Sequence, residues 1–140
     1  MTRRLLLSFV ALLPRLRAAQ QVVRGRLRQD PSLPPAITLR DGAVVVLEAD
    51  AATAGVLRDA RLKDDDFEAQ GRFAAPRRFV VDPIHLRALF VHRAGRRLVV
   101  TYWCAVCAVR AWTPGPCQCC QDEMALDPRD PALKDTDPSN

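Results

Sequence analysis

Residues 36–48 read AITLRDGAVVVLE, in which Asp41-Gly42 separates two apolar runs. Asp-Gly between two apolar runs is a strong short-range signal for a tight β-hairpin turn. The arm after the turn, residues 43–48, is a continuous and mostly β-branched run, which is typical of a strand covered on both faces. The stretch therefore predicts a β-hairpin at the centre of a mainly β fold.

The segments on both sides of this hairpin extend the pattern. Residues 21–29 alternate, with Val23 and Leu27 on one face and arginines on the other, which indicates a half-buried strand with a basic outer face. Asp50 is placed to cap a short helix over residues 51–58. The expected strands are residues 21–29, 36–40, 43–48, 67–73 and 78–82, and a last hairpin joins 88–92 to 97–103.

Five strands with a helix between the third and the fourth are the layout of an OB-type Greek-key barrel. Gly25 and Gly71 lie inside expected strands, where a barrel needs bends or bulges. We therefore expect a small OB-like barrel with one short helix, followed by a C-terminal β-hairpin and a cysteine-rich knuckle. The stretch from Val22 to Asp82 resembles exported bacterial OB-fold modules, which implies the same barrel. An open β-sandwich, or a sheet packed by one helix, is the alternative fold.

The first 20 residues have the pattern of an export signal. Arg3 and Arg4 precede an apolar run over residues 5–13, and Ala18-Ala19 offers small residues for cleavage. The run is shorter than the about 20 residues that span a bilayer. We expect residues 1–20 to be a signal peptide, which would place the mature chain in the periplasm or outside the cell. A short amphipathic helix that stays on the protein is the alternative.

Charge is distributed unevenly along the chain. Loss of Arg3, Arg4, Arg15 and Arg17 with the signal would lower the formal net charge from +5 to +1. Residues 121–140 hold six acidic and two basic side chains, so the body before them is correspondingly basic. A basic body suits an anionic partner but also an ordinary solvated surface. We expect the polar, proline-containing tail, residues 124–140, to be disordered.

All five cysteines lie in the stretch TYWCAVCAVRAWTPGPCQCCQDE, which begins at Thr101. Cys104 and Cys107 form one C-x2-C pair, Cys117 and Cys120 form a second, and Cys119 lies inside the second pair. Two such pairs bring four sulfur atoms onto two tight turns that can surround one tetrahedral ion. The segment 104–123 therefore predicts a metal site with four cysteine ligands, and Cys119 is a spare thiol or an alternate ligand. Zinc is the default metal, and copper(I) is the second choice.

Two other interpretations of the cysteines remain open. Disulfides suit an oxidising compartment, although five cysteines leave one unpaired. Residues 103–107 resemble the W-C-x-x-C of thioredoxin-like proteins, which implies a dithiol redox element of the cell envelope. That chemistry needs a helix after the first cysteine, whereas residues 108–112 read as extended. The YWCxxC segment, residues 102–107, also resembles that of exported bacterial proteins and implies export.

The sequence favours a binding or structural module, with its barrel at residues 21–103, over an enzyme. It contains no Ser-His-Asp order, glycine-rich phosphate loop or paired carboxylates. His85 and His92 are weaker candidates for extra metal ligands. A nucleic-acid-binding barrel is a minor alternative, because export removes the usual nucleic-acid partners and few aromatic residues are available for stacking. An unknown protein or small molecule is the expected partner.

Overall fold

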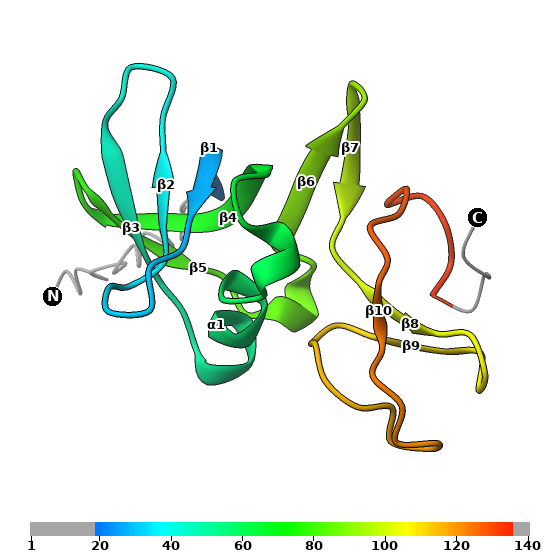
Figure 1. Ribbon diagram of the computed structural model, residues 1–140. Helices are drawn as coiled ribbons and strands as arrows, with labels where there is room; N and C mark the ends of the chain where they lie inside the picture. Colours follow the sequence, from blue (N-terminus) through cyan, green and yellow to red (C-terminus); the bar gives the residue numbers. More distant parts are fainter. Residues whose placement is uncertain (1–18, 136–140) are drawn as a thin grey trace, which may run out of the picture.

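The computed structural model describes residues 19–135, and the signal expected over residues 1–20 lies outside this range except for its last two residues. The described chain forms a seven-stranded sheet and a smaller three-stranded sheet (Figure 1). The larger sheet contains β1 (Gln21–Arg28), β2 (Ala36–Thr38), β3 (Val44–Glu48), β4 (Asp66–Ala75), β5 (Arg78–Val81), β6 (Leu89–Arg93) and β7 (Arg96–Val99). The smaller sheet contains β8 (Tyr102–Cys104), β9 (Val109–Ala111) and β10 (Ala125–Leu126). The helices are α1 (Ala51–Leu57) and the 3-10 turns η1 (Ala60–Leu62) and η2 (Ile84–Leu86).

Five strands of the larger sheet close into a barrel. They pair in the order β1-β2-β3-β5-β4, and β4 pairs again with β1. The β3–β5 pairing is parallel, and the other pairings of the barrel are antiparallel. Helix α1 follows β3 and precedes β4 (Figure 1). The mainly β, OB-like Greek-key barrel with one short helix is therefore confirmed.

The hairpin of residues 36–48 and the helix form as the sequence predicts. The register pairs Ile37 with Val45, and both side chains lie in the core. Asp50 caps α1, because its carboxylate accepts a hydrogen bond from the backbone N–H of Thr53 at 2.8 Å. The Thr53 hydroxyl in turn accepts from the backbone N–H of Ile84 at 2.9 Å, so the helix is tied to η2.

Two glycines lie where long strands change partners. β1 pairs with β4 from Gln21 to Arg26 and with β2 from Arg26 onward, and Gly25 lies at this change. β4 pairs with β1 up to Gly71 and with β5 from Gly71 onward. A Cβ atom at Gly25 would collide with the Thr38 carbonyl oxygen. The absence of a side chain lets the neighbouring backbones approach closely enough to close the barrel.

The segment expected as one strand, residues 97–103, is divided between the two sheets. β7 ends at Val99 and β8 begins at Tyr102, so Val100 and Thr101 join the sheets. Both linking residues are fully buried, and the backbone N–H of Val100 donates to the Leu89 carbonyl at 3.1 Å. This bond continues the β6–β7 register by one residue, and at Thr101 the chain pairs instead with Asp127, whose backbone N–H donates to the Thr101 carbonyl at 2.7 Å.

Residues 124–135, which the sequence predicts to be disordered, follow a defined path along both sheets. β10 pairs with β8, with Ala125 opposite Trp103. Farther along, Val99 and Arg129 exchange two backbone hydrogen bonds of 2.8 and 3.0 Å. Met124 is buried in the core. Within residues 19–135, no helix has the length and apolar character needed to cross a bilayer.

We predict that Gly71→Ala destabilises the barrel by about 1–3 kcal/mol, because the added methyl group would press against the Val80 carbonyl oxygen and the Phe79 ring. The matched control is Gly55→Ala in α1, where a Cβ atom meets nothing within 4 Å. Its expected effect is a gain of about 0.5–1 kcal/mol. Urea unfolding of both variants measures the difference. A Gly71→Ala protein as stable as the parent would contradict the close approach of the strands.

Candidate metal centre

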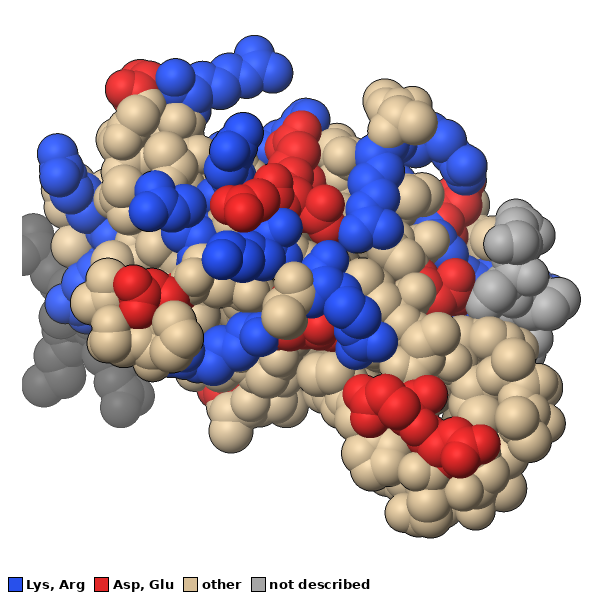
Figure 2. All heavy atoms as spheres, in the orientation of Figure 1, with Lys and Arg blue, Asp and Glu red and all other residues tan. Residues whose placement is uncertain are grey.

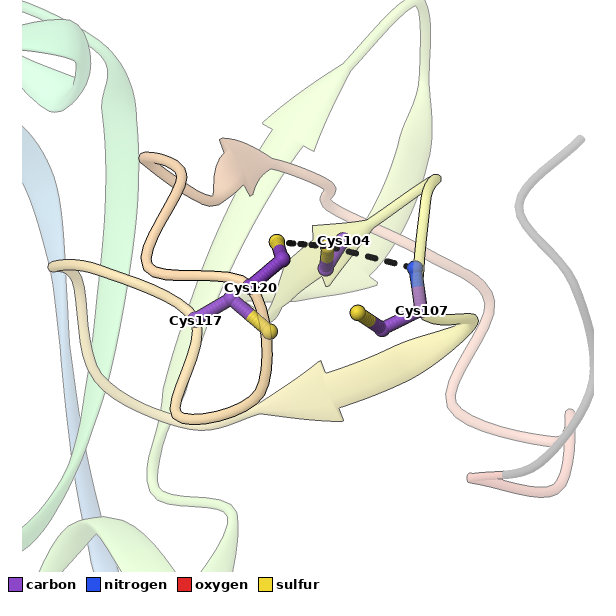
Figure 3. Close-up of side chains that lie close together, drawn as sticks. All are labelled: Cys104, Cys107, Cys117 and Cys120. Carbon is purple, nitrogen blue, oxygen red and sulfur yellow. Dashed lines mark hydrogen bonds between the residues drawn. The ribbon is translucent and has the colours of Figure 1, made fainter.

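Four cysteine sulfur atoms converge beside the smaller sheet (Figure 3). Cys104 ends β8, Cys107 lies in the turn to β9, and Cys117 and Cys120 lie in the loop between β9 and β10. Their Sγ atoms all lie within 4.8 Å of one another, and the Sγ atoms of Cys104 and Cys120 are 3.6 Å apart. Sulfur ligands about 2.3 Å from a tetrahedral zinc ion are roughly 3.8 Å apart. The four sulfur atoms are thus within small side-chain movements of a metal shell.

The two C-x2-C turns have two features in common: a backbone N–H directed at the first cysteine and a positive φ after the second. The backbone N–H of Cys107 donates to Cys104 Sγ at 3.5 Å, and the backbone N–H of Cys119 donates to Cys117 Sγ at 3.4 Å. In each turn the residue after the second cysteine has a positive φ, 51° at Ala108 and 68° at Gln121. This conformation turns the chain so that both cysteines of a pair face the same point.

Backbone N–H groups favour the thiolate form in the second turn. They lower the pKa of Cys117 to about 7, first through the N–H of Cys120 and then through that of Cys119. The pKa of Cys107 is raised, chiefly because its sulfur shares a hydrogen bond with the Cys119 thiol and also because burial disfavours its charge. Thiolates are the metal-binding form, and a coordinated cation deprotonates its thiol ligands.

Backbone pairing closes the loop that carries the second pair of cysteines. The backbone N–H of Cys117 donates to the Asp122 carbonyl at 2.7 Å, and that of Met124 donates to the Gly115 carbonyl at 3.0 Å. Gly115 has φ 127°, a conformation that favours glycine. The loop is therefore held at its base, and its tip positions Cys117 and Cys120.

A buried arginine supports the sheet below the cysteines. The side chain of Arg110 on β9 is 3% exposed and pairs with Asp127 at 2.5 Å. The same guanidinium donates to the Thr101 hydroxyl at 2.7 Å and lies over the Trp103 ring, 4.7 Å from its centroid. Arg110 lies on β9, and these partners lie just before β8, on β8 and just after β10, so its side chain connects the chain segments that form the small sheet.

A second polar network fixes the small sheet to the barrel. The fully buried Tyr102 donates its hydroxyl to Asp59 at 2.8 Å. Arg61, on η1, pairs with Asp59 at 2.8 Å and donates to the Met124 carbonyl at 3.0 Å. Burial, followed by the bond to Asp59, raises the pKa of Tyr102 and keeps it protonated. The cysteine centre is thus braced against a rigid part of the barrel.

The structure places the other candidate residues away from the four-sulfur group. Cys119 is exposed and does not belong to the group, although its thiol contacts Cys107. His92 lies on β6, where its Nε2 is 2.7 Å from the Glu68 carboxylate. His85 lies in η2. Within residues 19–135, the metal-competent group consists of cysteines alone.

Comparisons of the chain with protein-family models, curated proteins and solved structures found no match. The fold and the geometry of the site define an OB-type barrel that carries a four-cysteine centre on an added three-stranded sheet.

We predict that Ala108→Val weakens the centre, because a β-branched side chain crowds the backbone at the positive φ of Ala108 more than a methyl group does. The added strain should appear as a severalfold loss of metal affinity. The matched control is Ala105→Val, in the same turn but without positive φ. Competition with a chromogenic chelator measures both variants. Equal affinities for the two variants would show that the turn conformation is not required.

We also predict that Tyr102→Phe lowers the free energy of unfolding by about 1–2 kcal/mol, because the variant loses the buried hydrogen bond to Asp59. Thermal and urea unfolding would measure the loss. Metal content should remain that of the parent, since Tyr102 supplies no ligand. A parent-like unfolding free energy would mean that the network does not brace the two sheets.

Proposed function

We propose that the chain is a small exported module in which Cys104, Cys107, Cys117 and Cys120 bind one zinc ion. The observation that carries the proposal is the convergence of four Sγ atoms within 4.8 Å, with backbone N–H groups directed at two of them. Thiolates prefer soft or borderline cations over calcium and magnesium. A set of four cysteines is a common shell of structural zinc sites.

Zinc would act as a structural cross-link in this module. Four cysteine ligands fill a tetrahedral shell and leave no open position for a reacting water molecule. The chain from Ala105 to Glu123 includes one three-residue strand, and Val106 is 76% exposed. Because this segment buries little apolar surface of its own, an ion that joins its two turns would supply the missing stability. We therefore propose a binding or structural role for the module, not catalysis.

Export belongs to the same proposal. The basic start, the apolar run over residues 5–13 and the small residues Ala18-Ala19 support it. Outside the cytoplasm, free thiols tend to oxidise, and metal coordination would protect four of the five. Cell fractionation and the N-terminal sequence of the recovered protein would test this part. A cytoplasmic protein that keeps Met1 would reject export and leave the metal centre untouched.

Dithiol redox chemistry is the second candidate function, and two observations favour it. The Sγ atoms of Cys104 and Cys120 are only 3.6 Å apart, and the exposed Cys119 thiol interacts with Cys107 closely enough to raise the pKa of Cys107. Intact mass before and after reduction separates the two functions. If reduction raises the mass of protein freshly isolated from cells by two hydrogens per bridge, redox chemistry is favoured. A mass that reduction leaves unchanged would exclude disulfides.

We predict one zinc ion per chain in protein purified without chelators, as measured by elemental analysis. Cys117→Ser should reduce zinc affinity by at least about 10-fold, because it removes a ligand from the four-sulfur group. Cys119→Ser is the matched control and should keep full zinc content. Absence of stoichiometric zinc in the parent protein would reject zinc, and copper in its place would change the metal but keep the centre.

Zinc removal should loosen the small sheet while the barrel stays folded. Both tryptophans of the chain, Trp103 and Trp112, lie next to the cysteines, so near-ultraviolet circular dichroism and fluorescence report on this region. We expect a strong chelator to change both signals and leave the far-ultraviolet spectrum of the barrel largely intact. Retention of both tryptophan signals after complete zinc removal would contradict a structural role for the ion.

A further inference from the structure

A groove of about 710 Å³ lies on the outer face of the barrel, away from the cysteines. Arg24, Arg26 and Arg28 of β1 line it, together with Arg40 from the turn between β2 and β3. Figure 2 shows basic side chains gathered over the barrel on this face, with a group of acidic side chains between them. Four arginines and two aspartates line the groove, so its lining has an excess of positive charge.

The acidic side chains near the groove are largely neutralised by other partners. Asp66 pairs with Arg24 through two hydrogen bonds of 3.0 and 2.7 Å. Asp65 pairs with Arg93 at 2.7 Å. Glu68 is buried and is bound by Arg97 at 2.6 Å, as well as by the histidine of β6. Asp64 also lines the groove and has no ion pair among residues 19–135, so one carboxylate faces the remaining three arginines and the groove keeps a net positive charge.

Arg26, Arg28 and Arg40 form no ion pair with any residue between 19 and 135. At longer range, the charge of Arg40 helps to lower the pKa of Asp66, and that of Arg28 helps to lower the pKa of Asp30. These three guanidinium groups thus keep their hydrogen-bond donors available to solvent or to a ligand. Arginine is well suited to an anionic ligand, since its planar fork matches phosphate oxygens bidentately.

The arginines are arranged in a row. Every second residue of a strand lies on the same face, so Arg24, Arg26 and Arg28 repeat at roughly 6.8 Å. Arg26 lies opposite Thr38 in the register, and the Thr38 hydroxyl at this groove has no hydrogen-bond partner within the described chain. The groove has no aromatic side chain in its lining. Base stacking needs such a platform, so the groove fits a ligand whose charges lie in its backbone.

We propose that this groove binds an extended, phosphate-bearing polymer through Arg26, Arg28 and Arg40. The recognised group is the repeated phosphate, which a nucleic-acid strand and an inorganic or polyol phosphate chain have in common. The site shares no residue with the cysteine centre, so its occupation does not depend on the metal. It adds a partner of defined chemistry to the structural role proposed above.

The test uses the zinc-loaded full chain with two probes, inorganic polyphosphate and a fluorescent oligothymidylate, in direct binding and competition assays. Arg26→Gln/Arg28→Gln/Arg40→Gln should weaken polyphosphate binding by about 10-fold or more. A plot of log affinity against log salt concentration should also become less steep, by about 1 for each lost phosphate contact. The matched control is Arg58→Gln/Arg72→Gln/Arg77→Gln, which removes the same charge from exposed positions outside the groove. It should bind within about threefold of the parent, since exposed charges outside the lining act on the ligand only through solvent, where salt screens them.

The outcomes separate the alternatives. No polyphosphate binding at low salt would overturn the proposal, and so would equal losses in the groove and control variants. Binding of oligothymidylate alone would show that bases are read, which also contradicts it. Comparable affinities for the two probes support recognition of the phosphate chain. Arg26→Lys/Arg28→Lys/Arg40→Lys, which keeps the charge but not the planar fork, should recover only part of the affinity lost in the glutamine variant. Full recovery would contradict bidentate recognition by the guanidinium groups.

Discussion

Four sulfur atoms within 4.8 Å of one another are the constraint on which the C-terminal part of the structure depends. Four thiolates at this separation repel one another strongly, because like charges interact at short range. Hydrogen bonds already divide the four thiols: the backbone N–H groups of Cys120 and Cys119 lower the pKa of Cys117, whereas the hydrogen bond shared with the Cys119 thiol raises the pKa of Cys107. A divalent cation removes the conflict, since it stabilises all four thiolates together. Both the geometry of the turns and the charge of the thiolates therefore favour a bound divalent cation.

The barrel supplies the rigidity that the cysteine turns lack. Tyr102 and Met124 belong to the same buried core as the barrel residues, and Cys117 is part of that core too. The hydrogen bonds from Tyr102 and Arg61 to Asp59 fix where β8 leaves the barrel. Cys104 lies two residues after Tyr102 on the same strand, so the fixed start of β8 also fixes the position of the Cys104 sulfur. Sites held by rigid elements keep their geometry better than sites on free loops.

The sequence predicts the barrel because its signals are local. Alternating strands, the Asp41-Gly42 turn and the Asp50 cap act within a few residues, and the structure contains all of them. The break between β7 and β8 coincides instead with the pairing of Thr101 with Asp127, a contact distant in sequence that no local pattern encodes. The path of residues 124–135 rests mainly on backbone pairing, which their polar composition conceals. The cysteine spacing predicts the four-sulfur group, whereas the positive φ of Ala108 and Gln121 has no sequence signal, because neither is glycine or asparagine.

The two proposed sites also differ in charge, and this difference would orient a polyanionic partner. Four thiolates with one divalent cation carry a net charge of about −2, and Asp122 and Glu123 follow Cys120 in the same loop. The barrel face carries Arg26, Arg28 and Arg40 without ion-pair partners within the described residues. Complementary potential attracts a charged chain, and like potential excludes it. A phosphate polymer would therefore bind the barrel face and be repelled by the cysteine sheet. A metal ion at the cysteines could then stabilise the fold without competing for the polymer.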